Sequence, residues 1–434
     1  MNARASSRTL RWAVSLTLAC AAGAALAAEE SSLVTLGLGA EYTDNVRRVT
    51  DGEEADTVVT ASLNADIRRT TTRFDTGFNA DLAYDYFTEG SYDAGVRGNA
   101  VLAFEGQIVR QRLSWYVDDS FGQLPLASLA PDTPDNRENF NVFTTGPRFT
   151  QPFGSRTRLI LTGVYEIETY EQTPVDAKRT GADLALRRDI SPSQYLEVTA
   201  TTRDTRYDDD VYDDYDMDEY YLTWSATGAK TELTLSAGET RLSFPGRDDN
   251  SAMYRLDAER KVGSYGTLSL VGRSQKATTA EAFRTEQGTG APTLATGPIA
   301  AVGEPFDYDY VGLGYDLGGR HLSGSLLASS GRYRYDTNSI NNHDRKALNG
   351  SVDWIVSPTW TVGFGLEYAH ETYELIDQDY KELGYLFDAT LRLSRTLSLE
   401  FGAARFDRNG AAGSSAYDET RARIMVTYTS GKAG

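Results

Sequence analysis

The stretch RFDTGFNADLAYDYF, residues 73–87, alternates between two kinds of side chain. One set is apolar or aromatic apart from a threonine: Phe74, Thr76, Phe78, Ala80, Leu82, Tyr84 and Tyr86. The set between them is small or polar: Asp75, Gly77, Asn79, Asp81, Ala83 and Asp85. A period of two predicts a β-strand whose two faces meet different surroundings. A half-buried strand of a soluble sandwich has the same pattern, so the rest of the chain has to decide.

The same alternation recurs from Leu33 to the end of the chain. It is clearest at residues 58–67, 360–370, 382–394 and 420–429. We count about twenty such segments of roughly nine to fifteen residues, and about 9–11 residues suffice to cross a bilayer at a tilt. Aromatic residues gather at the ends of several segments, as expected at the two faces of a membrane.

The connections between these segments alternate in length. The short turns lie at 69–72, 191–193, 227–230, 318–320, 357–359 and 394–396, and the longer polar stretches lie near 45–53, 122–138, 208–215, 281–305, 331–345 and 408–416. This asymmetry predicts an all-β fold, a transmembrane up-and-down antiparallel β-barrel of about 20 strands, with about 18–22 possible. A sandwich or a secreted β-solenoid remains the alternative, although soluble strands average only about five or six residues.

The first residues have the pattern of an export signal. Three arginines precede the apolar run WAVSLTLACAAGAALA (12–27), which ends in a small-residue cleavage motif. We therefore predict a signal peptide over residues 1–27 and one outer-membrane β-barrel domain over residues 28–434. A retained anchor helix and a lipidated Cys20 are the alternatives. Because the strand pattern begins at Leu33, we expect no N-terminal plug domain.

Charge and cysteine content exclude several functions. The net charge is −19, and loss of the three arginines of the signal peptide lowers it to −22. Nucleic acid is therefore not an expected partner, because phosphate binding requires a basic surface. Cys20 is the single cysteine, so the exported chain would have neither disulfides nor thiol chemistry. No cofactor is expected.

A barrel of about twenty strands is wider than its own side chains can fill, so a water-filled conduit is the expected function. The candidate lumen-lining residues carry both signs of charge: Asp75, Asp81, Asp85, Arg110, Arg112, Arg158, Glu166, Arg187, Asp388, Arg392, Arg421 and Arg423. Opposed rows of carboxylates and guanidiniums would favour polar or zwitterionic solutes. The alternative is that these groups pair with strand neighbours and hold the wall together.

Three connections carry further hypotheses. Residues 122–136 and 279–305 are unusually apolar or rich in Ala, Gly and Pro, so either segment could fold back into the lumen or stay outside. The stretch DDDVYDDYDMDE (208–219) is strongly acidic. Its weak candidate ligands for Ca²⁺ are Asp208, Asp209, Asp210, Asp213, Asp214 and Asp216, and a solvated acidic loop is the alternative.

Catalytic residues are scarce, and we predict that the protein is not an enzyme. Its three histidines, His321, His343 and His370, lie far apart in sequence. His321 and Ser323 resemble the His-x-Ser pair of outer-membrane phospholipases, but no neighbouring Asn can be assigned to them. A lipid hydrolase is kept as a third functional hypothesis.

The segment LGAEYTDNVRRVTDGEEADTVVTASLNADIRR (38–69) resembles the start of exopolysaccharide-associated outer-membrane β-barrels, the β-barrel porin 2 type. The resemblance implies a role in polysaccharide secretion or surface attachment, without chemistry on the sugar. The expected partners are outer-membrane lipid and lipopolysaccharide, the barrel-assembly machinery, exopolysaccharide and periplasmic export components. The second hypothesis is a structural or adhesive barrel with cation-binding acidic loops and no productive pore.

Overall fold

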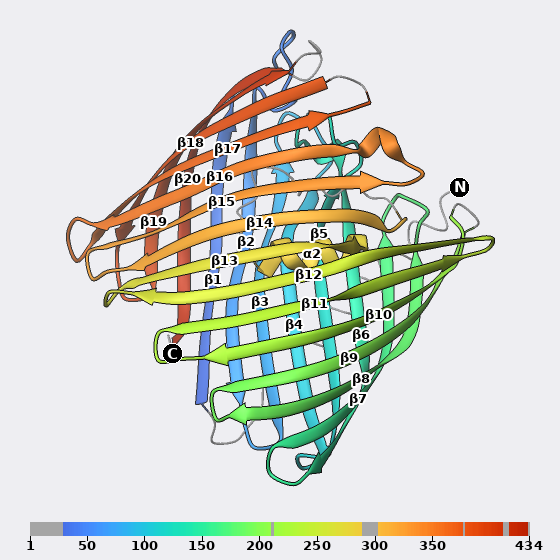
Figure 1. Ribbon diagram of the computed structural model, residues 1–434. Coiled ribbons are helices and arrows are strands. Elements are labelled where there is room, and N and C mark those ends of the chain that lie inside the picture. The colour runs from blue at the N-terminus through green and yellow to red at the C-terminus, as the bar shows by residue number, and fades with distance from the viewer. Residues whose placement is uncertain (1–28, 210–211, 289–302, 376–377, 411–415, 433–434) are drawn as a thin grey trace.

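Twenty antiparallel strands form one closed sheet in the computed structural model (Figure 1), which describes residues 29–209, 212–288, 303–375, 378–410 and 416–432. The strands are β1 (Glu29–Thr43), β2 (Asp56–Thr70), β3 (Phe74–Phe87), β4 (Gly95–Val109), β5 (Leu113–Pro125), β6 (Arg137–Phe153), β7 (Thr157–Tyr170), β8 (Ala177–Ser191), β9 (Gln194–Tyr207), β10 (Tyr215–Thr227), β11 (Thr231–Phe244), β12 (Arg247–Val262), β13 (Gly266–Ala277), β14 (Phe306–Gly318), β15 (Leu322–Tyr335), β16 (His343–Ile355), β17 (Trp360–Tyr373), β18 (Gln378–Arg392), β19 (Leu397–Gly410) and β20 (Tyr417–Lys432). Each strand pairs with the next, and β1 also pairs with β20, which closes the barrel.

The predicted fold class is therefore confirmed, and the sandwich and solenoid alternatives are wrong. The strands are 12 to 17 residues long, well above the five or six residues that are usual in soluble sheets. Closure leaves no free sheet edge, which is the condition for a sheet to cross a bilayer.

The segment quoted at the start of the sequence analysis is strand β3, and its two faces are now assigned. Asp81 and Asp85 line a cavity inside the barrel. Tyr84 and Tyr86 alternate with them and are about half exposed on the outside, at 49% and 54%. Other strands place large apolar side chains on the same outer surface, including Leu36, Leu38, Val198, Leu222, Val311, Leu326, Phe364, Ile424 and Val426. The apolar face therefore points towards lipid and the polar face towards the lumen.

The two ends of the barrel differ as the connection lengths predict. Nine short turns join even strands to odd strands at what we call the turn end: 71–73, 110–112, 154–156, 192–193, 228–230, 263–265, 319–321, 356–359 and 393–396. The opposite or loop end carries the other connections: 44–55, 88–94, 126–136, 171–176, 208–214, 245–246, 278–305, 336–342, 374–377 and 411–416. Strand β1 begins and strand β20 ends at the turn end.

Short helices occur only in loop-end connections, within the described residues. Two 3-10 turns are η1 (Pro134–Asn136) and η2 (Ser339–Asn341), and one α-helix, α2 (Thr279–Gly288), lies inside the barrel (Figure 1). No helix in the described part of the chain is long and apolar enough to span a membrane. The predicted signal peptide, residues 1–27, lies outside the described residues.

The apolar core is also inside the barrel and belongs mostly to the side near α2. Its members are Leu124, Phe140, Val142, Tyr170, Val175, Ala277, Ala280, Ala282, Phe283, Phe306, Tyr308, Tyr310, Tyr333 and Tyr335. Part of the lumen is thus packed like a protein interior, with α2 as its centre. No separate plug domain is present among the described residues.

Candidate functional site

Helix α2 begins with a capping box directly after β13. The hydroxyl of Thr278 accepts a hydrogen bond from the backbone N–H of Glu281 at 3.2 Å. In return, the Glu281 carboxylate accepts one from the backbone N–H of Thr278, also at 3.2 Å. This reciprocal pair satisfies two donors of the first helical turn and fixes where the helix starts. Ala280 and Ala282 are fully buried, so the helix packs closely against the wall.

Two side chains fasten α2 to the wall across the lumen. Arg284 donates to the Glu166 carboxylate on β7 at 3.0 Å and to the Thr144 hydroxyl on β6 at 2.5 Å. The ring of Phe283 meets that of Phe140 on β6 edge to face, with centroids 5.1 Å apart. A segment that begins at β13 is therefore held on β6 and β7, which lie several strands away around the barrel.

The wall beneath α2 contains a buried charge network. Arg179 on β8 donates to Glu166 at 2.8 Å and also contacts Glu168. On the helix itself, burial and the nearby Glu219 raise the pKa of Glu281, and Arg255 opposes this shift. The helix thus contributes a carboxyl group to an environment that disfavours its charge.

The connection 126–136 also folds inward, and Asn136 determines its shape. The Asn136 side chain accepts from the backbone N–H of Ala127 at 2.8 Å and donates to the carbonyls of Ala127 and Pro131 at 3.0 and 3.1 Å. Asp132 forms a two-point ion pair with Arg137, with contacts of 2.5 and 2.7 Å. These hydrogen bonds and the ion pair lie within residues 127–137, so the connection has a defined fold of its own.

Two arginines from distant parts of the chain hold this connection in place. Arg408 on β19 donates to the carbonyl of Leu129 at 2.7 Å, and its guanidinium lies 3.6 Å from the centre of the Tyr380 ring. Arg48 donates to the carbonyl of Asp132 and to the Glu419 carboxylate, both at 2.9 Å. The backbone φ of Arg48 is 53°, a conformation that side chains other than glycine rarely adopt.

The environment of Asp132 favours its charged form. Burial alone would raise the pKa of this carboxyl, but the ion pair with Arg137 and the nearby Arg48 outweigh burial and lower it. The anchor of the connection is therefore ionised at neutral pH.

A cavity of about 1050 Å³ remains beside the two inward segments. Its wall is the inner face of β1–β5 and β14–β20, and Asp132 and Phe283 complete it on the side of the inward segments. On β1 it runs from Thr43 near the loop end to Leu33 near the turn end. The cavity therefore follows most of the height of one side of the barrel.

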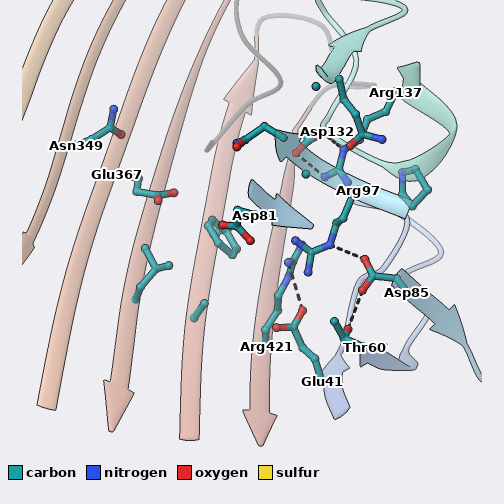
Figure 2. Close-up of a pocket in the computed structure, with 18 of the residues that line it drawn as sticks. Glu41, Thr60, Asp81, Asp85, Arg97, Asp132, Arg137, Asn349, Glu367 and Arg421 are labelled. Atoms are coloured by element: carbon teal, nitrogen blue, oxygen red, sulfur yellow. Dashed lines mark hydrogen bonds and ion pairs between the residues drawn. The ribbon is translucent and has the colours of Figure 1, made fainter. Parts of the chain in front are cut away.

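The cavity wall is charged, and most opposite charges lie beside one another. Its cations are Arg48, Arg97, Arg137, Arg345, Arg421 and Arg423, and its carboxylates are Glu41, Asp66, Asp81, Asp85, Asp132, Glu367, Asp388 and Glu419. Figure 2 shows Arg97 reaching Asp85 and Arg421 reaching Glu41, at 2.5 and 3.3 Å. Arg423 meets Asp388 at 3.0 Å. These groups form ion pairs between strands.

Asp81 and Glu367 are different, because neither forms an ion pair within the described part of the chain. Asp81 lies in register between Asn64 of β2 and Asn99 of β4, and all three line the cavity. Glu367 lies opposite Asn349 of β16 (Figure 2). The cavity wall therefore contains carboxylates that are not in ion-pair contact with any arginine among the described residues.

The predicted lumen residues fall into separate places. Asp81, Asp85, Asp388, Arg421 and Arg423 line the cavity, and Glu166 binds α2. Arg158 and Arg187 share Asp189 near the turn end, and Asp75 accepts from Thr70 there. Arg110 and Arg112 lie in a turn and Arg392 is the exposed last residue of β18.

Four functional residues were not predicted from the sequence: Arg48, Asp132, Arg137 and Arg408. Arg48 and Asp132 lie in connections, where no alternating pattern marks them. Arg137 and Arg408 lie on strands, but their roles depend on partners in the connection 126–136.

The acidic connection and the histidines add no second site. Asp214 accepts from the backbone of Tyr207 at 3.0 Å, and Asp208 pairs with Lys178 at 2.6 Å. No group of three or more Asp, Glu, His or Cys side chains is arranged for a metal ion among the described residues, and Asp210 lies outside them. His321 lies in the turn 319–321, and His343 is buried between the rings of Tyr333 and Tyr373.

The closed sheet, its apolar outer face and its polar lumen define a porin-like transmembrane β-barrel. The chain matches no family model and no curated protein. The resemblance to exopolysaccharide-associated barrels therefore has no support from these two comparisons.

Several solved structures are similar to it in fold. A mutant of the ferric enterobactin receptor PfeA of Pseudomonas aeruginosa, in complex with enterobactin, has a TM-score of 0.45 at 9% identity, covering 92% of this chain and 81% of that chain. Pseudomonas aeruginosa OccK2 in complex with glucuronate scores 0.37 at 11% identity, covering 93% and 99%. A BenF-like porin from Pseudomonas fluorescens Pf-5 scores 0.38 at 10% identity, covering 93% and 99%.

Proposed function

We propose that this protein is a conduit in the outer membrane of a Gram-negative bacterium that passes polar solutes through one side of its lumen. The observation that carries the proposal is the cavity of about 1050 Å³ along the inner face of β1–β5 and β14–β20. Its lining of carboxylates, guanidiniums and amides binds water readily, and the packed cluster around α2 confines the path to this side.

The lining supports a polar polymer such as exopolysaccharide as the substrate. Asn64, Asn99 and Asn349 place amide groups at the cavity, and Thr60 places a hydroxyl group there. Such hydrogen-bonding groups suit the hydroxyl groups of a sugar. Because the uncompensated charge of the passage is negative, a neutral or mixed-charge polymer fits better than an acidic one.

Conductance in a planar lipid bilayer tests the conduit. The refolded chain from residue 28 is compared with an Arg284→Ala variant, in which α2 has lost its ion pair with Glu166. We expect steady conductance from the wild type, larger in the variant, and partial block by neutral oligosaccharides added to the bath. Silence from both correctly folded proteins would overturn the conduit and favour the structural or adhesive barrel.

The third hypothesis has its own test in the same preparation. A lipid hydrolase would release fatty acid from the bilayer, and His321→Ala would abolish that release. We expect no release from either protein.

A further inference from the structure

The turn end has connecting turns that carry positive charge and no negative charge. Its nine turns, all within the described residues, contain no Asp or Glu. They contain seven cationic side chains, which we call the turn cations: Arg73, Arg110, Arg112, Arg156, Lys230, Arg320 and Arg395. All seven are exposed.

The loop end has the opposite charge. By sequence, its ten connections hold 21 Asp and Glu residues against three arginines, Arg47, Arg48 and Arg284. The protein is therefore strongly polarised along the barrel axis, and its overall negative charge conceals a basic end.

The turn cations are also unpaired, unlike most arginines of the barrel. None of the seven forms an ion pair in the part of the chain that the structure describes, and the Arg112 guanidinium donates to the neutral side chain of Gln151 at 2.8 Å. By contrast, Arg158 and Arg187, which lie on strands close to the same end, share Asp189. Seven exposed and unneutralised cations at one end form a surface for an anionic partner.

The position of the turn cations relates this surface to the membrane. Exposed apolar side chains lie beside them in sequence: Val109 next to Arg110, Phe153 near Arg156 and Leu393 near Arg395, each at least half exposed. The turn cations thus stand where the lipid-facing surface ends, at the depth of the headgroups. They follow β2, β4, β6, β10, β14 and β18, so they surround the barrel.

We propose that the turn end binds anionic phospholipid headgroups of the leaflet that faces the periplasm. Short turns of such barrels face the periplasm, and a ring of cations around the whole circumference matches a continuous sheet of phosphates better than a protein docked on one side. This proposal concerns the membrane contact of the barrel and does not depend on whether its lumen conducts.

The test uses spin-labelled lipids with the refolded barrel in phosphatidylcholine bilayers. The fraction of spin label immobilised at the barrel is compared for phosphatidylglycerol and phosphatidylcholine. We expect phosphatidylglycerol to associate more strongly, on the order of a few-fold, since each cation near an anionic surface contributes modestly. The preference should fall as salt is added.

Two variants with four substitutions each complete the experiment. They change the net charge by the same amount in opposite directions. The turn variant carries Arg110→Gln, Arg112→Gln, Arg156→Gln and Arg395→Gln, and it should lose most of the preference. The loop variant carries Asp51→Asn, Glu53→Gln, Glu89→Gln and Asp93→Asn at four exposed positions of the loop end. It should keep the wild-type preference.

Three results would overturn the proposal. They are equal association of both lipids with the wild type, a preference that survives in the turn variant, and a preference that rises in the loop variant as much as it falls in the turn variant. The first would point to an acidic periplasmic protein instead, and the third would show that net charge alone governs lipid association.

Discussion

The guanidinium of Arg284 on helix α2 lies 3.0 Å from the carboxylate of Glu166 on β7. This contact joins two residues that are 118 positions apart in sequence, across the inside of the barrel. The contact is one of a small number that hold the helix against that wall. The position of α2 inside the barrel therefore depends on individual side chains that can be removed one at a time.

Removal of the Arg284 side chain should widen the passage. Arg284→Ala loses the ion pair with Glu166, while Glu166 keeps its bond to Arg179. Because the Arg284 side chain is partly exposed, we expect α2 to be weakened by about 1 kcal/mol and single-channel conductance to rise. Arg47→Ala, which removes an exposed ion pair with Glu54, serves as the control and should leave conductance unchanged.

Loss of the Phe283 ring should release α2 further. Phe283 is 8% exposed and packs edge to face on Phe140, so Phe283→Ala should cost about 3 kcal/mol of local stability. Trypsin would then cleave after Arg284 in the folded barrel, and mass spectrometry would identify the cut. Phe401→Ala on the outer face should not expose this bond, and equal cleavage in both variants would contradict the assigned role of Phe283.

The inward connection 126–136 should depend on Arg408. This buried side chain binds the Leu129 carbonyl and lies over the ring of Tyr380. Its removal also takes away the ion pair between Arg408 and the buried carboxylate of Glu382. We expect Arg408→Ala to lower the free energy of unfolding by about 3 kcal/mol. Arg405→Ala removes an exposed pair on the same strand and should cost less than about 1 kcal/mol. Urea titrations of both variants provide the comparison.

Asp81 should set the charge preference of the passage. Asp81→Asn removes an unpaired carboxylate from the cavity wall and keeps the shape of the side chain, so the cation preference should decrease. The reversal potential across a potassium chloride gradient measures it. Asp75→Asn, on the same strand but outside the cavity lining, is the control. An unchanged potential in Asp81→Asn would place the selective step elsewhere.

Acid should release the connection 126–136. The pKa of Asp132 is lowered in the fold by its ion pair with Arg137, whereas an unfolded Asp titrates near about 3.9. The stabilisation is therefore fully present above about pH 4 and is lost as the pH falls through the lowered value. Unfolding midpoints measured at decreasing pH should drop more steeply for the wild type than for Asp132→Asn. Parallel curves would exclude Asp132 as the group responsible.

The strands were predictable because lipid and water impose a period of two on every one of them. Val426 and Tyr428 on β20 show this as clearly as β3 does. The alternating lengths of the connections then determined the topology, because a meander places every second connection at the same end.

The contacts inside the lumen were not predictable in the same way. Arg408 and Leu129 are 279 positions apart, and Arg48 and Glu419 are 371 apart, so no local pattern relates them. The apolar composition of 122–136 and 279–305 did indicate segments that could turn inward. Of the second segment, residues 289–302 lie outside the described part of the chain. The one local signal for α2 was the capping pair of Thr278 and Glu281.

The pairing of β1 with β20 has a consequence for how the protein is made. It joins Ser32 to Lys432, so β20 completes the hydrogen bonds of β1 over almost the whole length of the described chain. Until then the growing sheet has two open edges, which attract other chains and promote aggregation. Closure over so long a separation is also slow. A chain truncated before β20 would leave β1 and β19 with unpaired edges, so we expect it to aggregate rather than to form a stable barrel.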